Sequence, residues 1–161
     1  IATSFAVNQT DGLDGLAGGT LLIAFFAFGL IAYVRGQDNL AALIGVVAGS
    51  LLAFLWFNVY PARFFMGDTG SMGLGVLLAL VAFLTNSIAL LPIIGFVFVL
   101  EAVTTIMQIV SKKVFKKKIF LSAPIHHHFE ALGWPETKVT MRAWIFASVL
   151  AIIGIIVYFL G

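Results

Sequence analysis

Long apolar segments are the feature that most limits how this chain can fold. They are residues 17–34, 40–57, 72–84, 88–110 and 143–160. A helix that spans a bilayer needs roughly 17–25 apolar residues, and only the third segment falls short. It reaches that length only by including Gly70, Ser71 and Asn86. The segments therefore predict an all-α, polytopic transmembrane helical bundle with about five spans.

Composition supports a membrane protein and limits the chemistry available to it. The 161 residues are 61% hydrophobic and only 10% charged, with a mean hydropathy of +1.12, which a water-soluble domain could not cover with polar surface. The chain has no cysteine, so a disulfide framework and a thiolate metal site are excluded. A metal would be held by oxygen or imidazole, which favours Mg²⁺ or Mn²⁺ over zinc. Small residues four apart predict close helix contacts at Gly15/Gly19, Gly45/Gly49 and Ser71/Gly75.

Basic residues indicate which way the bundle faces. If five spans alternate, loops 1–16, 58–71 and 111–142 share one face, which receives every Lys and Arg except Arg35. The positive-inside rule makes that face cytoplasmic. The basic run 112–118, "KKVFKKK", is typical of an anchor on anionic lipids, so membrane lipids are expected partners. No nucleic-acid partner is expected.

The first residues favour a longer protein. The chain begins with Ile1, and "IATSFAV" resembles the end of an apolar helix. Together with the odd number of spans, this predicts the C-terminal portion of a protein of about ten spans, whose N-terminal helices are missing from this sequence.

The first polar motif is "NQTDGLDGLAGG", residues 8–19. Asp11 and Asp14 are three residues apart, so on a helix or in a tight turn they share a face and can converge with the amide of Asn8. Glycines let backbone N–H groups approach a bound anion at a helix start. The alternative is plain helix capping, for which Asn, Asp and Thr are the usual residues.

The second motif is "FFMGDTGSMGLG", residues 64–75. Asp68 is a hard oxygen ligand flanked by hydroxyls and unobstructed backbone amides, the combination that a divalent cation and a diphosphate need together. A capping role, worth about 0.3–1 kcal/mol at a helix start, is the alternative. The lysine of a P-loop and the ligand pattern of an EF-hand are both absent.

Two further polar features accompany the acidic motifs. In "APIHHHFE", residues 123–130, three consecutive histidines cannot all point one way, and Pro124 with the later Trp134–Pro135 pair predicts a fixed loop. A surface histidine cluster is the alternative. Within segment 88–110, four polar residues lie along one helical face: Glu101, Thr104, Thr105 and Gln108. This polar stripe belongs either to a functional site or to hydrogen bonds between helices.

Taken together, the motifs resemble one family over essentially the whole chain. "NQTDGLDGLAGG", "NVYPARFFMGDTGS", "EAVTTIMQ" and "SAPIHHHFEALGWPE" are similar to successive signatures in the C-terminal half of the phospho-N-acetylmuramoyl-pentapeptide transferases, a branch of the polyprenyl-phosphate sugar-1-phosphate transferases. The resemblance implies a Mg²⁺-dependent enzyme of peptidoglycan synthesis in the bacterial inner membrane. Its substrates would be UDP-N-acetylmuramoyl-pentapeptide and undecaprenyl phosphate, and its products lipid I and UMP.

The resemblance also implies roles for particular residues. Asp68 matches the magnesium ligand of the family, and Asp11 and Asp14 match its second catalytic acidic motif. His127 joins these as a catalytic candidate, and Phe65 is suited to stacking on uracil. The substrate-binding candidates are Asn8, Gly12, Asn58, Phe65, Gln108, His126 and His128.

Two alternative functions and several questions stay open. A related transferase acting on UDP-N-acetylglucosamine shares the acidic motifs, whereas a multi-pass transporter would use Glu101 as its coupling group near the bilayer midplane. The paired aspartates and lysine of the family's first half have no counterpart in this sequence, so the chain alone is predicted to be inactive. Whether a homodimer forms, and which histidine does what, is left undecided.

Overall fold

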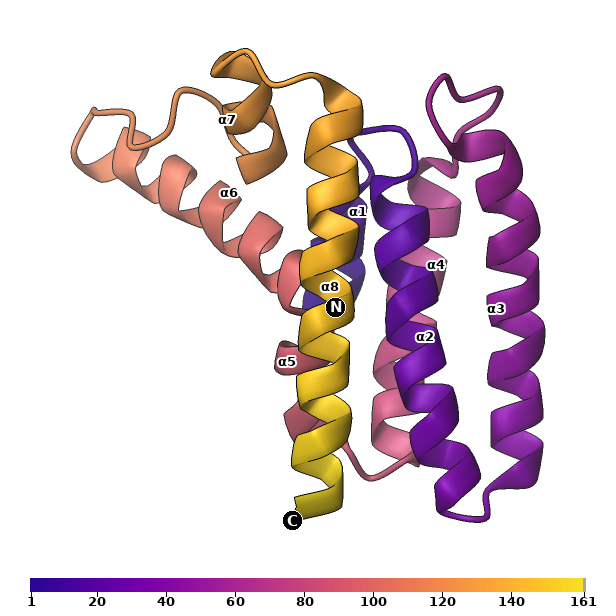
Figure 1. Ribbon diagram of the computed structural model, residues 1–161. Helices are drawn as coiled ribbons and strands as arrows, with labels where there is room; N and C mark the ends of the chain where they lie inside the picture. The colour runs from indigo at the N-terminus through magenta and orange to yellow at the C-terminus, as the bar shows by residue number, and fades with distance from the viewer. Residues whose placement is uncertain (161) are drawn as a thin grey trace.

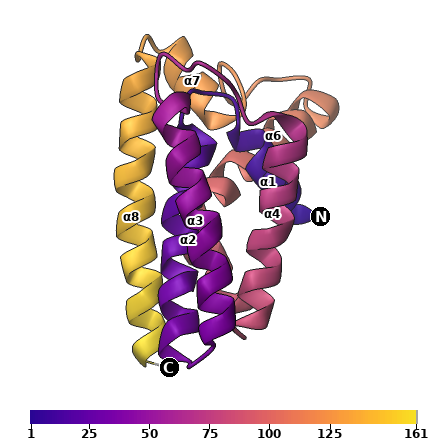
Figure 2. The same cartoon turned by 90° about the vertical axis from the view of Figure 1, so that its right-hand side faces the viewer.

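The protein is a bundle of helices, seen in a computed structural model that describes residues 1–160 (Figure 1). No strand occurs among these residues, so the all-α prediction is confirmed. Four helices are long and apolar enough to cross a membrane, and they run side by side in both views (Figures 1 and 2). They are α2 (Leu16–Val34), α3 (Asp38–Asn58), α4 (Gly67–Leu84) and α8 (Glu136–Leu160).

Helix α2 forms the centre of the core. It contacts α3 on one side and α8 on the other, and its aromatic side chains Phe25 and Phe28 are fully buried. Ile44 of α3 and Leu78 of α4 pack into the same cluster. The bundle therefore encloses α2, while the outer faces of α3, α4 and α8 carry exposed apolar side chains suited to lipid.

The remaining helices are short or bent. They are α1 (Ala2–Thr10), the 3₁₀ turn η1 (Ile88–Leu90), α5 (Leu91–Ile94), α6 (Phe96–Val114) and α7 (Ile125–Ala131). The segments Ile88–Ile94 and Phe96–Val114 are joined at a bend, and the protein has up to five spans if this bent pair is counted as one. Helix α1 lies within residues 1–16, which were predicted to be a loop. The first seven of these residues were expected to be the end of an apolar helix.

The predicted span 88–110 is a broken helix. The axis bends by 78° between the residues before Gly95 and those after it. Pro92 lies in the first turn of α5, where its missing N–H costs nothing. A Cβ at Gly95 would lie 2.9 Å from the carbonyl oxygen of Leu91, so the break requires glycine. Helix α6 consequently leaves the bundle at a steep angle (Figure 1).

Other helix bounds also differ from the apolar segments. Helix α4 begins at Gly67 instead of residue 72, and α8 begins at Glu136 instead of residue 143. The predicted loop 111–142 therefore contains the end of α6, all of α7 and the first turns of α8. Hydropathy missed these turns because polar residues often begin or end a helix outside the apolar core of a membrane.

The loops gather at two ends of the bundle as the alternation predicted. The turn after α1, the loop before α4 and the long connection around α7 lie at one end, at the top of Figure 1. The turns after α2 and α4 and the end of α8 lie at the other. Arg35 is alone among basic residues at this second end, so the charge asymmetry used to orient the chain is retained.

Small residues allow close contact at two of the three predicted places. A Cβ at Gly19 would overlap the indole of Trp144, whose Nε1 donates to the Gly15 carbonyl at 3.0 Å. A Cβ at Gly75 would lie 2.7 Å from the backbone of α1. The pair on α3 that begins with Gly45 has no neighbour within 4 Å, so close packing there was a wrong prediction for the described part of the chain.

Candidate active site

An amide and two carboxylates meet where α1 ends and α4 begins. Asn8 lies in the last turn of α1, Asp11 follows that helix, and Asp68 lies in the first turn of α4. The Asn8 Nδ2 donates to Asp68 Oδ1 at 2.8 Å and to Ser71 Oγ at 3.1 Å. Because Gly75 lets α1 and α4 approach closely, residues far apart in sequence share one site.

The two carboxylates at this site affect one another. Burial raises the pKa of Asp11, and the negative charge of Asp68 raises it further, while a hydrogen bond from the Gly67 backbone acts in the opposite direction. Asp68 itself is exposed at the loop end of the bundle. Two neighbouring carboxylates, of which Asp68 is open to solvent, form a place where a cation would be stabilised.

Asp14 takes part in a different set of contacts. Its Oδ2 accepts the backbone N–H of Ala62 at 2.9 Å, and its own N–H donates to Glu136. The expected convergence of the two motif carboxylates with the Asn8 amide is therefore wrong, since that amide donates to Asp68. Helix α1 ends at Thr10, so residues three apart beyond it no longer share a helical face.

The loop between α3 and α4 is held by Asn58 and presents Phe65. Asn58 is buried, with Oδ1 accepting the Gly15 N–H at 3.2 Å and Nδ2 donating to the Phe64 carbonyl at 3.1 Å. Its amide thus fixes the loop. The Phe65 side chain is 72% exposed and borders a hollow of about 500 Å³ between α3 and α4. That ring is placed to stack on a planar ligand.

The three histidines have three different partners, although the rings of His126 and His127 lie next to each other with centroids 4.2 Å apart. His126 is buried with Nδ1 2.9 Å from Glu101 Oε2. His127 is 42% exposed and pairs with Glu130 on its own helix at 2.6 Å, and His128 Nδ1 accepts a backbone N–H from the preceding loop at 3.2 Å. The predicted fixed loop is instead the first turn of α7, because Pro124 precedes a helix start there.

The first histidine packs against the acidic turn. A Cβ at Gly12 would overlap His126 Nε2 and lie 2.9 Å from its Cε1. Sequence reasoning had assigned the catalytic role to His127, whose side chain pairs on its own helix. It also left the role of Glu101 open between function and interhelical hydrogen bonding, although an ionisable residue in an apolar helix indicates a buried partner. No signal in the sequence names His126 as that partner.

Gln108 supports a loop. Its side chain is buried, its Oε1 accepts the N–H groups of Ile119 and Phe120 at 3.0 and 3.1 Å, and its Nε2 donates to the Phe120 carbonyl at 2.9 Å. The amide thus joins α6 to the connection that leads to α7. Thr104, on the same polar stripe, bonds to its own helix backbone. The stripe is buried at both residues.

The residues present suit a hard divalent cation. No group of three or more His, Asp or Glu side chains in residues 1–160 is placed to hold an ion. The donors at the α1–α4 junction are the carboxylates of Asp11 and Asp68. That set fits Mg²⁺, which keeps several waters and binds proteins through one or two carboxylates together with substrate phosphates.

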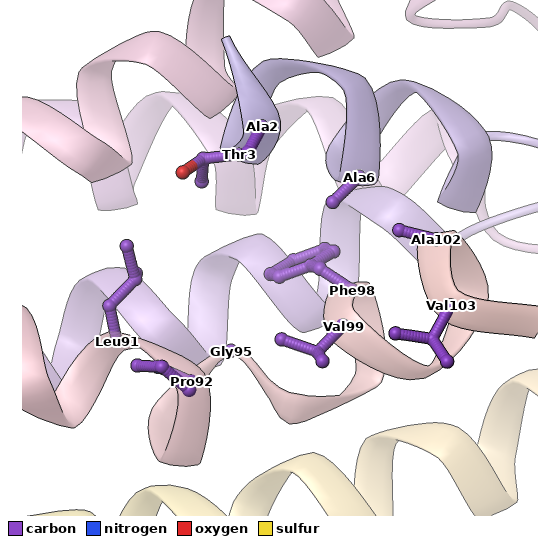
Figure 3. Close-up of a pocket in the computed structure, with 10 residues that line it drawn as sticks. All are labelled: Ala2, Thr3, Ala6, Leu91, Pro92, Gly95, Phe98, Val99, Ala102 and Val103. Atoms are coloured by element: carbon purple, nitrogen blue, oxygen red, sulfur yellow. The ribbon is translucent and has the colours of Figure 1, made fainter. Parts of the chain in front are cut away.

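An apolar pocket lies beside α1, toward its N-terminal end. It has a volume of about 250 Å³ and lies between α1 and the bend at Gly95 (Figure 3). Ala6, Phe98 and Val99 line it, and Thr3 provides the one polar side chain of its walls (Figure 3). Such a lining suits a hydrocarbon chain.

Comparison with known proteins places the chain in a family. Residues 1–86 match the family described as Glycosyl transferase family 4, and the protein belongs to that family. The match includes both acidic motifs and ends before the histidine helix.

The particular relatives share one name, phospho-N-acetylmuramoyl-pentapeptide-transferase. The relative from Rubrobacter xylanophilus is 45% identical over 159 residues, covering 99% of this chain and 48% of the relative. Those from Leptospira biflexa and Bartonella quintana are 49% and 47% identical, covering 95% and 96% of this chain and 45% and 48% of their own length. These similarities confirm the resemblance found from the motifs. The chain spans about half the length of the curated relatives it matches.

Proposed function

We propose that this chain forms the C-terminal half of an enzyme that transfers phospho-N-acetylmuramoyl-pentapeptide from its UDP carrier to undecaprenyl phosphate, giving lipid I and UMP. The observation that carries the proposal is the meeting of Asn8, Asp11 and Asp68 at the α1–α4 junction. The shared name of relatives that cover nearly the whole chain supports the choice of substrates.

The reaction asks for charge neutralisation and alignment. An oxygen of undecaprenyl phosphate attacks the β-phosphate of the UDP carrier, and the bond between that phosphorus and the departing UMP oxygen breaks. Mg²⁺ bound at Asp68 and Asp11 would supply positive charge to the phosphates. Asn8 orients the Asp68 carboxylate through its 2.8 Å hydrogen bond, while Asp14 and Asn58 hold the loop that carries Phe65.

Other features support the placement of both substrates. The exposed Phe65 ring offers a stacking surface for uracil, and the apolar pocket beside α1 offers a place for the start of a polyprenyl chain. The basic loops at the same end of the bundle would attract the anionic substrates. They also favour a cytoplasmic site in the bacterial inner membrane.

The decisive experiment measures UMP release by the full-length enzyme with both substrates, with and without Mg²⁺. Asp68→Asn should abolish release by removing the ligand charge. Asp38→Asn is the matched control, because Asp38 also lies in the first turn of a helix but at the opposite end of the bundle. Near-normal turnover of Asp68→Asn would contradict its role as the metal ligand.

The same assay separates the alternative substrate. UMP release with UDP-N-acetylglucosamine but not with the muramoyl-pentapeptide carrier would assign the chain to the related sugar-1-phosphate transferases. The isolated 161-residue chain should give no turnover, because the acceptor phosphate is expected to need groups from additional N-terminal helices.

A further inference from the structure

Glu101 and His126 form a buried pair that the proposed chemistry does not use. Glu101 is 3% exposed and His126 is 1% exposed, and they join α6 to α7 across 2.9 Å. A carboxylate away from water is costly unless it is paired and hydrogen-bonded. The contact therefore fixes the position of α7 as well as satisfying Glu101.

The pair determines which ring nitrogen of His126 carries a proton. A carboxylate only accepts hydrogen bonds, and imidazole is generally the stronger base of the two, so the shared proton lies on Nδ1. In the neutral ring, Nε2 then carries a lone pair. This atom is fully buried and has no hydrogen-bond partner among residues 1–160.

The surroundings of Nε2 favour the same tautomer. Nε2 faces the position where Gly12 would carry a Cβ, so a Cα hydrogen of Gly12 points at the ring. A lone pair can accept a weak Cα–H hydrogen bond there, whereas a proton on Nε2 would face another hydrogen. Gly12 directly follows Asp11, and His126 thus packs against the turn that carries this carboxylate.

We propose that Glu101 is a positioning residue, which holds His126 in its Nδ1-protonated tautomer so that the ring supports the Gly12 turn and, through it, Asp11. The catalytic part of this role rests on the proposed transferase function. The tautomer is a property of this chain and can be measured without substrate. Of the three histidines, the proposal thus links His126 to the acidic site, with Glu101 fixing the orientation of its ring.

The first test is the tautomer of His126 by ¹⁵N NMR of the side-chain nitrogens in detergent. His127→Ala and His128→Ala identify the signals of each ring. We expect a protonated Nδ1 and a bare Nε2 for His126, and loss of this preference in Glu101→Gln. Glu130→Gln is the matched control, since it makes the same change at the partly exposed partner of His127 and should leave the tautomer of His126 unchanged.

The second test is kinetic and uses the full-length enzyme. Glu101→Gln should lower kcat roughly 10–100-fold, as loss of an orienting partner commonly does, whereas Thr104→Val on the same buried face of α6 should not. In a His126→Asn background, Glu101→Gln should have little further effect, because both changes remove one unit.

Three results would overturn the proposal. They are an Nε2-protonated His126 in the unsubstituted chain, a tautomer unaffected by Glu101→Gln, and fully additive effects of the two substitutions on kcat. The tautomer of His126 is measured in the unsubstituted chain. The proposal can therefore be refuted even if the Glu101→Gln variant does not fold. If the unsubstituted full-length enzyme releases no UMP, the proposed function fails while the NMR result still decides the tautomer.

Discussion

Adding one methyl group at Gly12 should destabilise the protein through a single collision. The Cβ of Gly12→Ala would overlap His126 Nε2 and lie 2.9 Å from Cε1 and 3.4 Å from Cδ2. The ring cannot turn aside without giving up its 2.9 Å contact with Glu101. Because both side chains of that pair are buried, either the turn or the pair must move.

The expected size follows from these contacts. Overpacking a close contact costs about 1–3 kcal/mol, and a lost hydrogen bond to a charged group costs a similar amount, about 1.5–3 kcal/mol. The overlap is relieved either by a shift of the Gly12 turn or by loss of the Glu101–His126 contact. Because only one of these changes is needed, the two costs do not add. For a protein of this size, each kcal/mol lowers the Tm by about 2–4 °C, which predicts a decrease of about 2–12 °C.

Thermal unfolding in detergent, followed by circular dichroism, measures this effect. His126→Ala removes the ring, so Gly12→Ala should cost almost nothing in that background. Gly45→Ala is the control for a glycine with no neighbour within 4 Å. An equal loss of Tm from Gly12→Ala with and without the His126 ring would refute the collision.

Three further outcomes are expected. Gln108→Ala should loosen the loop after α6, measured as faster cleavage by trypsin, because three backbone groups of this loop lose their side-chain partner. Asp68→Asn should lower the pKa of Asp11 toward its usual value in a ¹³C NMR titration, since a neighbouring negative charge is removed. A raised pKa contributes stability at acid pH that is lost as pH rises through the folded value, so this variant should also recover stability at neutral pH. The amide oxygen introduced by Asp68→Asn can still accept the hydrogen bond from Asn8 Nδ2. Gly75→Ala should lower Tm by pushing α1 from α4, whereas Gly45→Ala should not.

Much of the fold could be predicted from the apolar segments, because a helix that crosses lipid must be long and apolar. The break at Gly95 could not, since Pro92 and Gly95 are tolerated inside straight membrane helices as well. Helix starts at Gly67 and Glu136 were missed because hydropathy is blind to polar first turns. The α7 helix was missed because it is too short for a periodic pattern to identify it.

The acidic site could be predicted in part. The sequence indicated that Asp68 and Asp11 would share a face, because both lie in loops on the same side of an alternating bundle. It could not indicate that Asp14 would contact Ala62, since this depends on where α1 ends. Likewise, the polar stripe marked Glu101 as unusual, but its pairing with His126 depends on how α7 docks on α6, and no local pattern encodes that.

The direction of the helices around the acidic site makes its two carboxylates unequal. Asp11 follows the C-terminal end of α1, where the helix dipole presents about half a negative charge, whereas Asp68 lies in the first turn of α4, where it presents about half a positive charge. The dipole of α1 thus acts at Asp11 in the same direction as the burial that raises the pKa of this carboxyl group. The two side chains are chemically identical, but the helix ends beside them present opposite partial charges.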